Sequence, residues 1–257
     1  SDLLQAMYGR NGDSPLAVLA AKSPADCFDT AIEAARIAIK FRCPVILLSD
    51  GYIANGAEPW RMPNVADIPD IDPDFRTEPE GYQPYARNTE TLARDWVRPG
   101  TPGLQHRVGG LEKDQLTGDV SYDPANHETM VGLREEKIQR IANDVAAVEV
   151  EGEQEGDLLV VGWGGTYGAL KQGVAGHLAQ GHKVGHLHLR WLNPLPRGIE
   201  DTFKRYKKVL VCELNRGQLW RHLRAECLVP AEKFTKVQGL PFMVSEIKQA
   251  IDKHLAE

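Results

Sequence analysis

The stretch LLVVGWGGTYGALKQG, residues 158–173, decides which class of fold the sequence predicts. It begins as an apolar run typical of a buried strand, breaks into glycines after Val161, and continues with the spacing of a helix. A strand, a glycine turn and a helix also form the start of nucleotide-binding α/β domains. The turn therefore either binds a dinucleotide or only lets the helix pack closely on the strand.

The spacing of the glycines argues against a dinucleotide. The fingerprint for that ligand is G-x-G-x-x-G, with an acid at the end of the next strand for the ribose. Gly162 and Gly164 fit the first two positions, but Tyr167 occupies the third, and Arg190 stands where the acid is expected. We keep an NAD(P)-binding oxidoreductase only as a less favoured alternative and expect the glycines to serve packing.

Strands and helices alternate on both sides of this stretch. Periodicity predicts strands at 157–164, 183–192, 208–215 and 233–239, and helices at 126–146, 166–181, 198–207, 217–227 and 243–255. This alternation predicts an α/β domain over 123–257, with a mainly parallel sheet flanked by helices. His186 and His188 share one face of a strand, but no third metal ligand accompanies them, so we interpret them as hydrogen-bonded sheet histidines.

Residues 1–58 predict a single parallel crossover unit. It comprises a strand at 15–21, a helix with Ser23 as its N-cap, and a strand at 44–50. The predicted apolar face of the helix consists of Phe28, Ala31, Ile32, Ala35 and Ile39. Two strands do not make a stable parallel sheet, so the remainder is expected in a partner or in a preceding segment of a longer protein.

Residues 59–122 predict an extended, proline-rich linker arm. Eight of the sixteen prolines lie between residues 59 and 102, and Trp60, Phe75 and Trp96 make the segment too aromatic for a free spacer. We expect this arm to lie across another surface.

Composition excludes several classes of function. With 30 basic and 36 acidic residues, the net charge of −6 gives no electrostatic footprint for nucleic acid. The four cysteines include no C-x-x-C pair, so no iron–sulfur or zinc site is expected in this chain. No apolar run is long enough to span a membrane and no leader is recognised, which predicts a cytoplasmic protein. No catalytic constellation or metal site emerges.

Six stretches carry a resemblance to a known family. They are SDLLQAMYGRNGDSP (1–15), the run from Ser23 to Trp60, TPGLQHRVGGLE (101–112), TGDVSYDPANHE (117–128), WLNPLP (191–196) and CELNRGQL (212–219). Together they resemble the alpha subunit of 2-oxoglutarate:ferredoxin oxidoreductase, in the wider 2-oxoacid:ferredoxin oxidoreductase family. The resemblance covers essentially the whole chain, from the last part of the pyrimidine-binding domain through a domain like the C-terminal domain of transketolase.

The resemblance implies part of an enzyme that converts 2-oxoglutarate and coenzyme A into succinyl-coenzyme A and reduces ferredoxin. In the family, thiamine diphosphate, Mg²⁺ and an iron–sulfur cluster belong mainly to the beta subunit. The 2-oxoacid-binding segment and the glutamate that activates thiamine would precede Ser1. We therefore expect this chain to bind none of these cofactors alone, to be inactive alone, and to partner the beta subunit, the N-terminal part of the alpha subunit and, through the complex, ferredoxin.

Two groups of residues are candidates for the vicinity of substrate or coenzyme A. The first group, Tyr8, Arg10, Asn11 and Asp13, would follow closely on the substrate-binding segment; Arg10 could bind a carboxylate or a phosphate, or form an interface ion pair. The second group, Asp50, Tyr52 and Asn55, follows the carboxyl end of a predicted parallel strand, where open α/β sheets bind ligands. Helix capping is an equal alternative for Asp50 and Asn55. An assembly module without catalysis remains the competing function.

Overall fold

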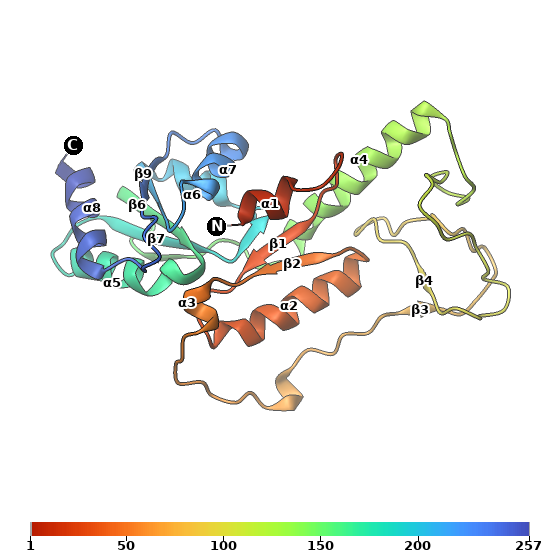
Figure 1. Cartoon of the computed structure of the whole chain (residues 1–257), viewed down its shortest axis with the longest axis horizontal. Helices are drawn as coiled ribbons and strands as arrows, with labels where there is room; N and C mark the ends of the chain where they lie inside the picture. The colour runs from red at the N-terminus through yellow and green to blue at the C-terminus, as the bar shows by residue number, and fades with distance from the viewer. Residues whose placement is uncertain (1, 257) are drawn as a thin grey trace.

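A computed structural model describes residues 2–256, and in it the chain forms an α/β structure with two main sheets (Figure 1). One sheet has three strands in the order β2-β1-β8, and the other has five in the order β10-β9-β6-β7-β5. The predicted fold class is confirmed: a mainly parallel sheet, flanked by helices, follows the end of a smaller parallel unit and an extended arm.

The five-stranded sheet is parallel except at one edge. Its parallel strands are β6 (Gly156–Trp163), β7 (Val184–Leu189), β9 (Tyr206–Glu213) and β10 (Glu232–Thr235), and β5 (Val150–Gly152) runs antiparallel beside β7. The central strands are apolar on both sides because each face of the sheet carries its own hydrophobic cluster.

Helices cover both faces of this sheet. One face carries α5 (Tyr167–Leu178) and α8 (Val244–Ala256), which pack against each other over Leu158 and Val160. The other face carries α6 (Ile199–Lys204) and α7 (Gln218–Cys227) over Leu159 and Val161 (Figure 1). The short helix η3 (Gly164–Thr166) joins β6 to α5.

The three-stranded sheet is completed from the far end of the chain. Strands β1 (Ala17–Ala20) and β2 (Val45–Leu48) are parallel and are joined by α2 (Asp26–Phe41). Strand β8 (Trp191–Asn193) pairs antiparallel with β1. The predicted single strand over 183–192 is therefore wrong, because the chain leaves one sheet and enters the other at Arg190, whose carbonyl accepts from the Ala20 N–H at 2.7 Å.

Helix α2 buries a different face from the predicted one. Thr30, Ile37 and Phe41 are buried, whereas the predicted Ala31 and Ala35 are exposed. The remaining members of the predicted face, Phe28, Ile32 and Ile39, are half-buried. The helix is turned toward Ile37 and Phe41 because these residues share a cluster with Trp191 of β8 and with Ile138 and Ile141, which lie roughly a hundred residues away in sequence.

Ser23 accepts from the Asp26 N–H at 3.3 Å, as expected of an N-cap, although regular helix begins only at Asp26.

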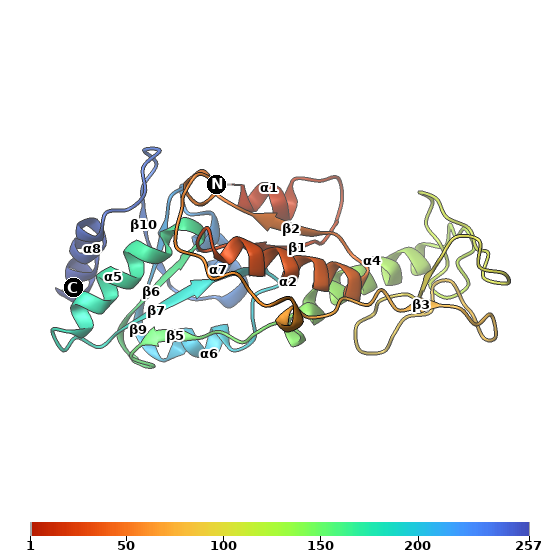
Figure 2. The same ribbon diagram turned by 90° about the horizontal axis from the view of Figure 1, so that it is seen from below.

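The arm and its return helix project from the body on one side (Figures 1 and 2). The arm contains the helix η1 (Val65–Asp67) and the two-residue strands β3 (Phe75–Arg76) and β4 (Trp96–Val97), and the short helix α3 (Gly51–Ala54) precedes it. It returns to the body through α4 (Pro124–Arg140) and η2 (Ile141–Asn143). Met130 and Ile138 of α4 and Ile141 of η2 are buried, while Leu133 of α4 and Val145, just beyond η2, are half-buried.

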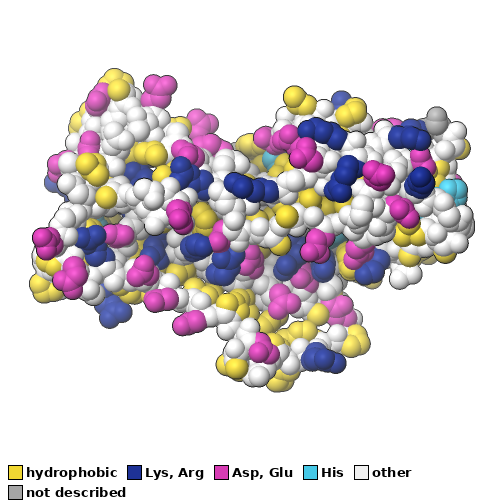
Figure 3. All heavy atoms as spheres, turned by 180° about the vertical axis from the view of Figure 1, so that it is seen from behind, with side chains coloured by type: hydrophobic (Ala, Val, Ile, Leu, Met, Phe, Trp, Pro, Cys, Tyr) yellow, Lys and Arg dark blue, Asp and Glu magenta, His cyan; other side chains and the backbone are white. Residues whose placement is uncertain are grey.

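Helix α1 (Leu3–Tyr8) lies against α7 and joins the core of the five-stranded sheet. Its Leu3 and Met7 belong to the same cluster as Val18 of β1 and Leu159 of β6. The chain's first and last thirds thus share one hydrophobic core. No helix within residues 2–256 combines the length and the apolar character needed to cross a bilayer. On the face shown in Figure 3, basic and acidic side chains are interspersed.

Candidate functional site

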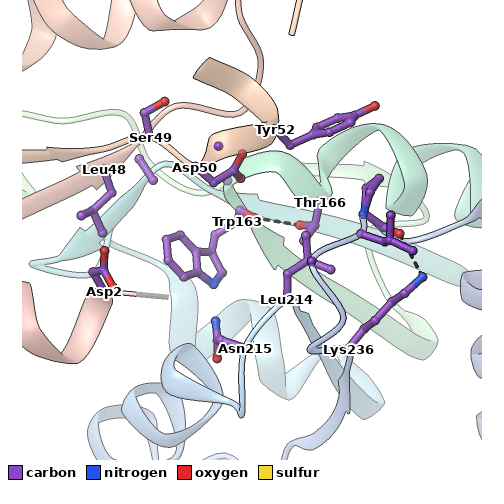
Figure 4. A pocket seen from close by; sticks show the side chains of 16 residues that line it. Asp2, Leu48, Ser49, Asp50, Tyr52, Trp163, Thr166, Leu214, Asn215 and Lys236 are labelled. Carbon is purple, nitrogen blue, oxygen red and sulfur yellow. Dashed lines mark hydrogen bonds between the residues drawn. The ribbon is translucent and has the colours of Figure 1, made fainter. Parts of the chain in front are cut away.

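The carboxyl ends of strands from both sheets meet at a cavity of about 510 Å³, which we name the junction cavity (Figure 4). Open α/β sheets bind ligands at this edge, because strand ends there leave loops free to form a crevice. Its lining residues are Asp2, Ala20, Leu48, Ser49, Asp50, Gly51, Tyr52, Trp163, Gly164, Thr166, Leu214, Asn215, Lys236, Gly239, Leu240 and Pro241.

Asp50 connects the two sheets at this cavity. Its Oδ1 accepts from the Ile53 N–H at 2.8 Å and so caps α3, while its Oδ2 accepts from the Gly165 N–H at 2.7 Å. A Cβ on Gly165 would lie only 2.5 Å from that Oδ2. The glycine turn does bind an anionic group through its backbone, and within the chain that group is the Asp50 carboxylate. Asp50 caps α3, as one of its two alternatives predicts, and it also lines the cavity; its place near substrate or coenzyme A stays a prediction.

The other glycines of the turn allow helix α5 to pack closely on β6. A Cβ on Gly162 would lie 2.2 Å from Leu170 Cδ1, and Gly164 has a φ of 59°. Tyr167 and Arg190, at the two positions where the dinucleotide fingerprint fails, make internal contacts. The Tyr167 hydroxyl donates to Glu151 at 2.7 Å, and Arg190 donates to Thr30 at 2.8 Å.

Glu213 is a buried carboxyl group that sequence reasoning missed. It ends β9 and accepts from the Trp163 indole N–H at 3.0 Å and from the Leu219 and Trp220 N–H groups at 2.8 and 3.0 Å. The Asn215 side chain donates to it as well, at 3.0 Å. Glu213 thereby fixes the indole that Figure 4 shows in the middle of the lining residues. The signal was present, because an acid directly follows the apolar run VLVC at a predicted strand end.

The structure does not bring the two predicted groups of site residues together. Asp50 and Tyr52 line the junction cavity, and the Tyr52 ring is 62% exposed and points away from it (Figure 4). The Asn55 side chain donates to the Gly51 carbonyl at 2.8 Å and closes α3. Asn11 and Asp13 lie in the loop that precedes β1, at the opposite end of the three-stranded sheet.

Arg10 is held by backbone carbonyls. Its guanidinium donates to the carbonyl oxygens of Ala6, of Met7 at 2.7 Å and of Ser14 at 2.7 Å. It thereby closes the last turn of α1 and shapes the loop that contains Asn11 and Asp13. Tyr8 is 64% exposed at the end of the same helix.

The two sheet histidines agree in part with the interpretation given to them. His186 Nδ1 lies 3.3 Å from Glu151 Oε2, but its Nε2 is buried without a hydrogen-bond partner in residues 2–256, and the buried ring of His188 contacts the Gly164 backbone. Burial lowers the pKa of His186 to about 4 and holds that of His188 well below its usual range. No group of three or more metal-ligating side chains is present in the described part of the chain. His186 thus keeps one hydrogen-bond partner, as predicted of the pair, while its Nε2 has none in the described residues.

The fold and the cavity define an α/β protein with two parts. A parallel β-α-β unit is joined, through the hydrogen bond between Asp50 and Gly165, to a larger sheet that has helices on both faces. Family comparisons agree with this class. Residues 1–121 match the family described as pyruvate flavodoxin/ferredoxin oxidoreductase, thiamine diP-bdg, and residues 156–247 match the pyruvate:ferredoxin oxidoreductase core domain II.

Individual relatives and a solved structure make the comparison specific. The 2-oxoglutarate oxidoreductase subunit KorA of Mycobacterium tuberculosis is 51% identical over all of this chain, which spans 39% of that protein. The 2-oxoglutarate synthase subunit KorA of Archaeoglobus fulgidus is 30% identical over 88% of the chain and 58% of its own length. The structure of 2-oxoglutarate:ferredoxin oxidoreductase from Magnetococcus marinus, with 2-oxoglutarate, coenzyme A and succinyl-CoA bound, superposes with a TM-score of 0.92 at 32% identity, over 99% of this chain and 45% of its own. The chain belongs to the 2-oxoacid:ferredoxin oxidoreductase family and spans less than two thirds of these relatives.

Proposed function

We propose that this chain is the C-terminal portion of the alpha subunit of a thiamine diphosphate-dependent 2-oxoacid:ferredoxin oxidoreductase, with 2-oxoglutarate as the 2-oxoacid. The complete enzyme would decarboxylate the substrate, form succinyl-coenzyme A and pass electrons to ferredoxin, or run in reverse. The observation that carries the proposal is the 51% identity, over the entire chain, to a protein named as a 2-oxoglutarate oxidoreductase subunit. The TM-score of 0.92 to an enzyme of that specificity supports it.

The residues of this chain do not fit a bound magnesium diphosphate by themselves. Residues 2–256 contain no group of three or more carboxylates, histidines or cysteines that could hold a metal ion. The Gly165 N–H, which could meet a phosphate, already donates to Asp50. We therefore infer that thiamine diphosphate, Mg²⁺ and the iron–sulfur cluster are held mainly by the beta subunit, and we assign no catalytic step to a side chain of this chain.

The contribution of this chain to the enzyme would be structural support of the substrate region. Arg10 would act indirectly, because its guanidinium fixes the loop that carries Asn11 and Asp13. Tyr8 and Tyr52 are both exposed, at 64% and 62%, and would meet the beta subunit or the N-terminal part of the alpha subunit. Asp50 would hold the two sheets together beneath that interface through its hydrogen bond with Gly165.

Reconstitution tests this proposal. The 257-residue chain alone should not reduce viologen with 2-oxoglutarate, thiamine diphosphate, Mg²⁺ and coenzyme A. The longer alpha polypeptide, co-expressed with its beta subunit, should reduce viologen with 2-oxoglutarate faster than with pyruvate. Turnover by the chain alone, or a preference for pyruvate in the complex, would contradict the respective part of the proposal.

The alternative function, a module that only assembles subunits, makes a different prediction for Arg10. In the complete enzyme, Arg10→Ala releases the loop that precedes β1, so we expect a raised KM for 2-oxoglutarate or coenzyme A in a complex of unchanged subunit composition. An assembly module predicts loss of the beta subunit in size-exclusion chromatography, with unchanged KM in whatever complex remains. Lys207→Gln, at an exposed ion pair with Asp157, is the control.

A further inference from the structure

A second cavity, of about 640 Å³, lies at the opposite end of the three-stranded sheet from the junction cavity. Its walls are the loop over 11–15, the turn over 42–44 and one side of α4. Four basic side chains line it, namely Arg42, His127, Arg134 and Lys137, against one lining acid, Asp13, and we name it the basic cavity.

Lys137 is the least neutralised of these cations. It is half-buried, and its ammonium group has one hydrogen-bond partner in residues 2–256, the Arg42 carbonyl oxygen at 3.3 Å. Burial lowers the pKa of Lys137, and the neighbouring guanidinium groups of Arg94, Arg87 and Arg134 lower it further. An ammonium group in such a position gains free energy when an anion enters the cavity beside it.

The remaining charges around the cavity are already engaged. Arg134 Nη1 lies 3.0 Å from Glu112 Oε1, and His127 contacts the other oxygen of the same carboxylate. The Arg42 guanidinium stacks on Trp96 at 4.4 Å and donates to the Ile39 carbonyl at 2.7 Å. One carboxylate thus contacts both Arg134 and His127, and a positive excess remains at the Lys137 end of the cavity.

Apolar side chains line the cavity together with the basic ones, and they indicate which kind of anion would fit. Val131 and Ile138 of α4 and the prolines Pro15 and Pro44 line the cavity beside the cations. A volume of this size accommodates a small organic molecule and greatly exceeds that of a bare inorganic ion. Lys137 is half-buried, so a flat acidic surface of another protein would meet the exposed His127 and Arg134 first and would not reach it.

We propose that the basic cavity binds a small organic phosphate, with its phosphate group on Lys137 and its organic part against Val131 and Ile138. Phosphate oxygens can accept from several donors at once, so Lys137 can share the phosphate with Arg134, three residues away on α4, whose guanidinium has further N–H groups besides the Nη1 that contacts Glu112. The proposal rests on the cavity and not on the proposed reaction.

Calorimetric titration of the 257-residue chain tests the site, with adenosine 5′-monophosphate as the probe and adenosine and succinate as comparisons. We expect saturable binding of the monophosphate and none of adenosine. Lys137→Gln should weaken binding about tenfold, the loss of one charge-assisted hydrogen bond. Lys207→Gln removes an exposed cation far from the cavity and should bind like the parent chain.

Cys43 provides an independent readout because it lines the basic cavity, whereas Cys27 does not. The monophosphate should slow alkylation of Cys43 by iodoacetamide and leave Cys27 unchanged, as followed by peptide mass spectrometry. If Lys137→Gln does not fold, Arg134→Gln at the exposed mouth replaces it and should weaken binding about threefold.

Three results would overturn the site. The first is that the monophosphate shows no saturable binding at low ionic strength. The second is that the Lys137→Gln or Arg134→Gln variant binds the monophosphate as tightly as the parent chain does. The third is that succinate binds as tightly as the monophosphate. The first two would remove the site, and the third would remove phosphate as its ligand class.

Discussion

The junction cavity and the histidine pair of β7 both lie at the five-stranded sheet, but they differ in whether their buried polar groups have hydrogen-bond partners. At the junction, the Asp50 and Glu213 carboxyl groups receive N–H donors from neighbouring turns and side chains. Beside it, the His186 Nε2 is buried without a partner in the described chain, although its Nδ1 lies 3.3 Å from Glu151 Oε2. Polar groups at strand ends can be met by the free N–H groups of the following turn, whereas those within a strand face side chains that offer none.

The largest test of this comparison is removal of the Glu213 carboxyl group. Glu213→Ala leaves the Trp163 indole and two backbone N–H groups buried without an acceptor, so we expect a loss of roughly 3–5 kcal/mol in the free energy of unfolding. Glu213→Gln keeps an acceptor oxygen and should lose less. Urea unfolding monitored by circular dichroism measures both, and equal losses would show that the buried donors do not set the stability here.

Acidification tests His186, whose Nε2 has no partner in the described residues. The pKa of His186 is about 4 in the folded chain against 6.5 for an unperturbed histidine, so the unfolded chain binds more protons between these values. Stability should be fully present above pH 6.5 and fall as the pH decreases, with about 3 kcal/mol attributable to His186 lost by pH 4.

A matched pair of variants isolates the histidine from the carboxyl groups that titrate at lower pH. His186→Gln should flatten the decline in unfolding free energy between pH 6.5 and 4.5, whereas His182→Gln, at an exposed position, should leave it unchanged. Identical slopes for His186→Gln and the parent chain would show that His186 remains neutral without destabilising the fold.

The glycine turn offers an intermediate test. Gly162→Ala would place a Cβ 2.2 Å from Leu170 Cδ1, and we expect a loss of about 2 kcal/mol from this overpacking. Gly168→Ala meets nothing within 4 Å and lies within α5, so it should be neutral or stabilising by up to about 1 kcal/mol. Thermal unfolding compares the two variants. A Gly162→Ala variant as stable as Gly168→Ala would contradict close packing as the role of that glycine.

The sequence predicted the five-stranded sheet well because its elements are defined locally. Short apolar runs, such as LLVV (158–161) in β6 and VLVC (209–212) in β9, alternate with helices whose periodicity is visible within one window. The fold class follows from that alternation alone. The dinucleotide hypothesis was also weakened locally, since Tyr167 stands where the fingerprint needs a glycine.

Long-range pairings explain what the sequence could not predict. The strand break at Arg190 depends on β1, which lies more than 160 residues earlier, and the buried face of α2 depends on Ile138 and Ile141. No local pattern shows which distant element will cover a helix whose several faces are all partly apolar. For the same reason Asp50 could be placed at a strand end, but its bond to Gly165 could not be predicted.

The smallest expected effect is at Asp50 itself. Asp50→Ala removes one acceptor from the Ile53 N–H and one from the Gly165 N–H, so we expect a loss of about 1–2 kcal/mol in unfolding free energy. Asn64 caps a short exposed helix through one bond, to the Ala66 N–H at 3.2 Å, and Asn64→Ala should lose no more than about half as much. Asp50→Asn retains an oxygen for one of the two donors, so its unfolding free energy should fall between those of the parent chain and Asp50→Ala.

Amide hydrogen exchange distinguishes a local role of Asp50 in α3 from a role in connecting the two sheets. If Asp50 joins the sheets, exchange should accelerate at Gly165 and Thr166 as well as at Ile53, whereas acceleration confined to α3 would reduce Asp50 to a helix cap.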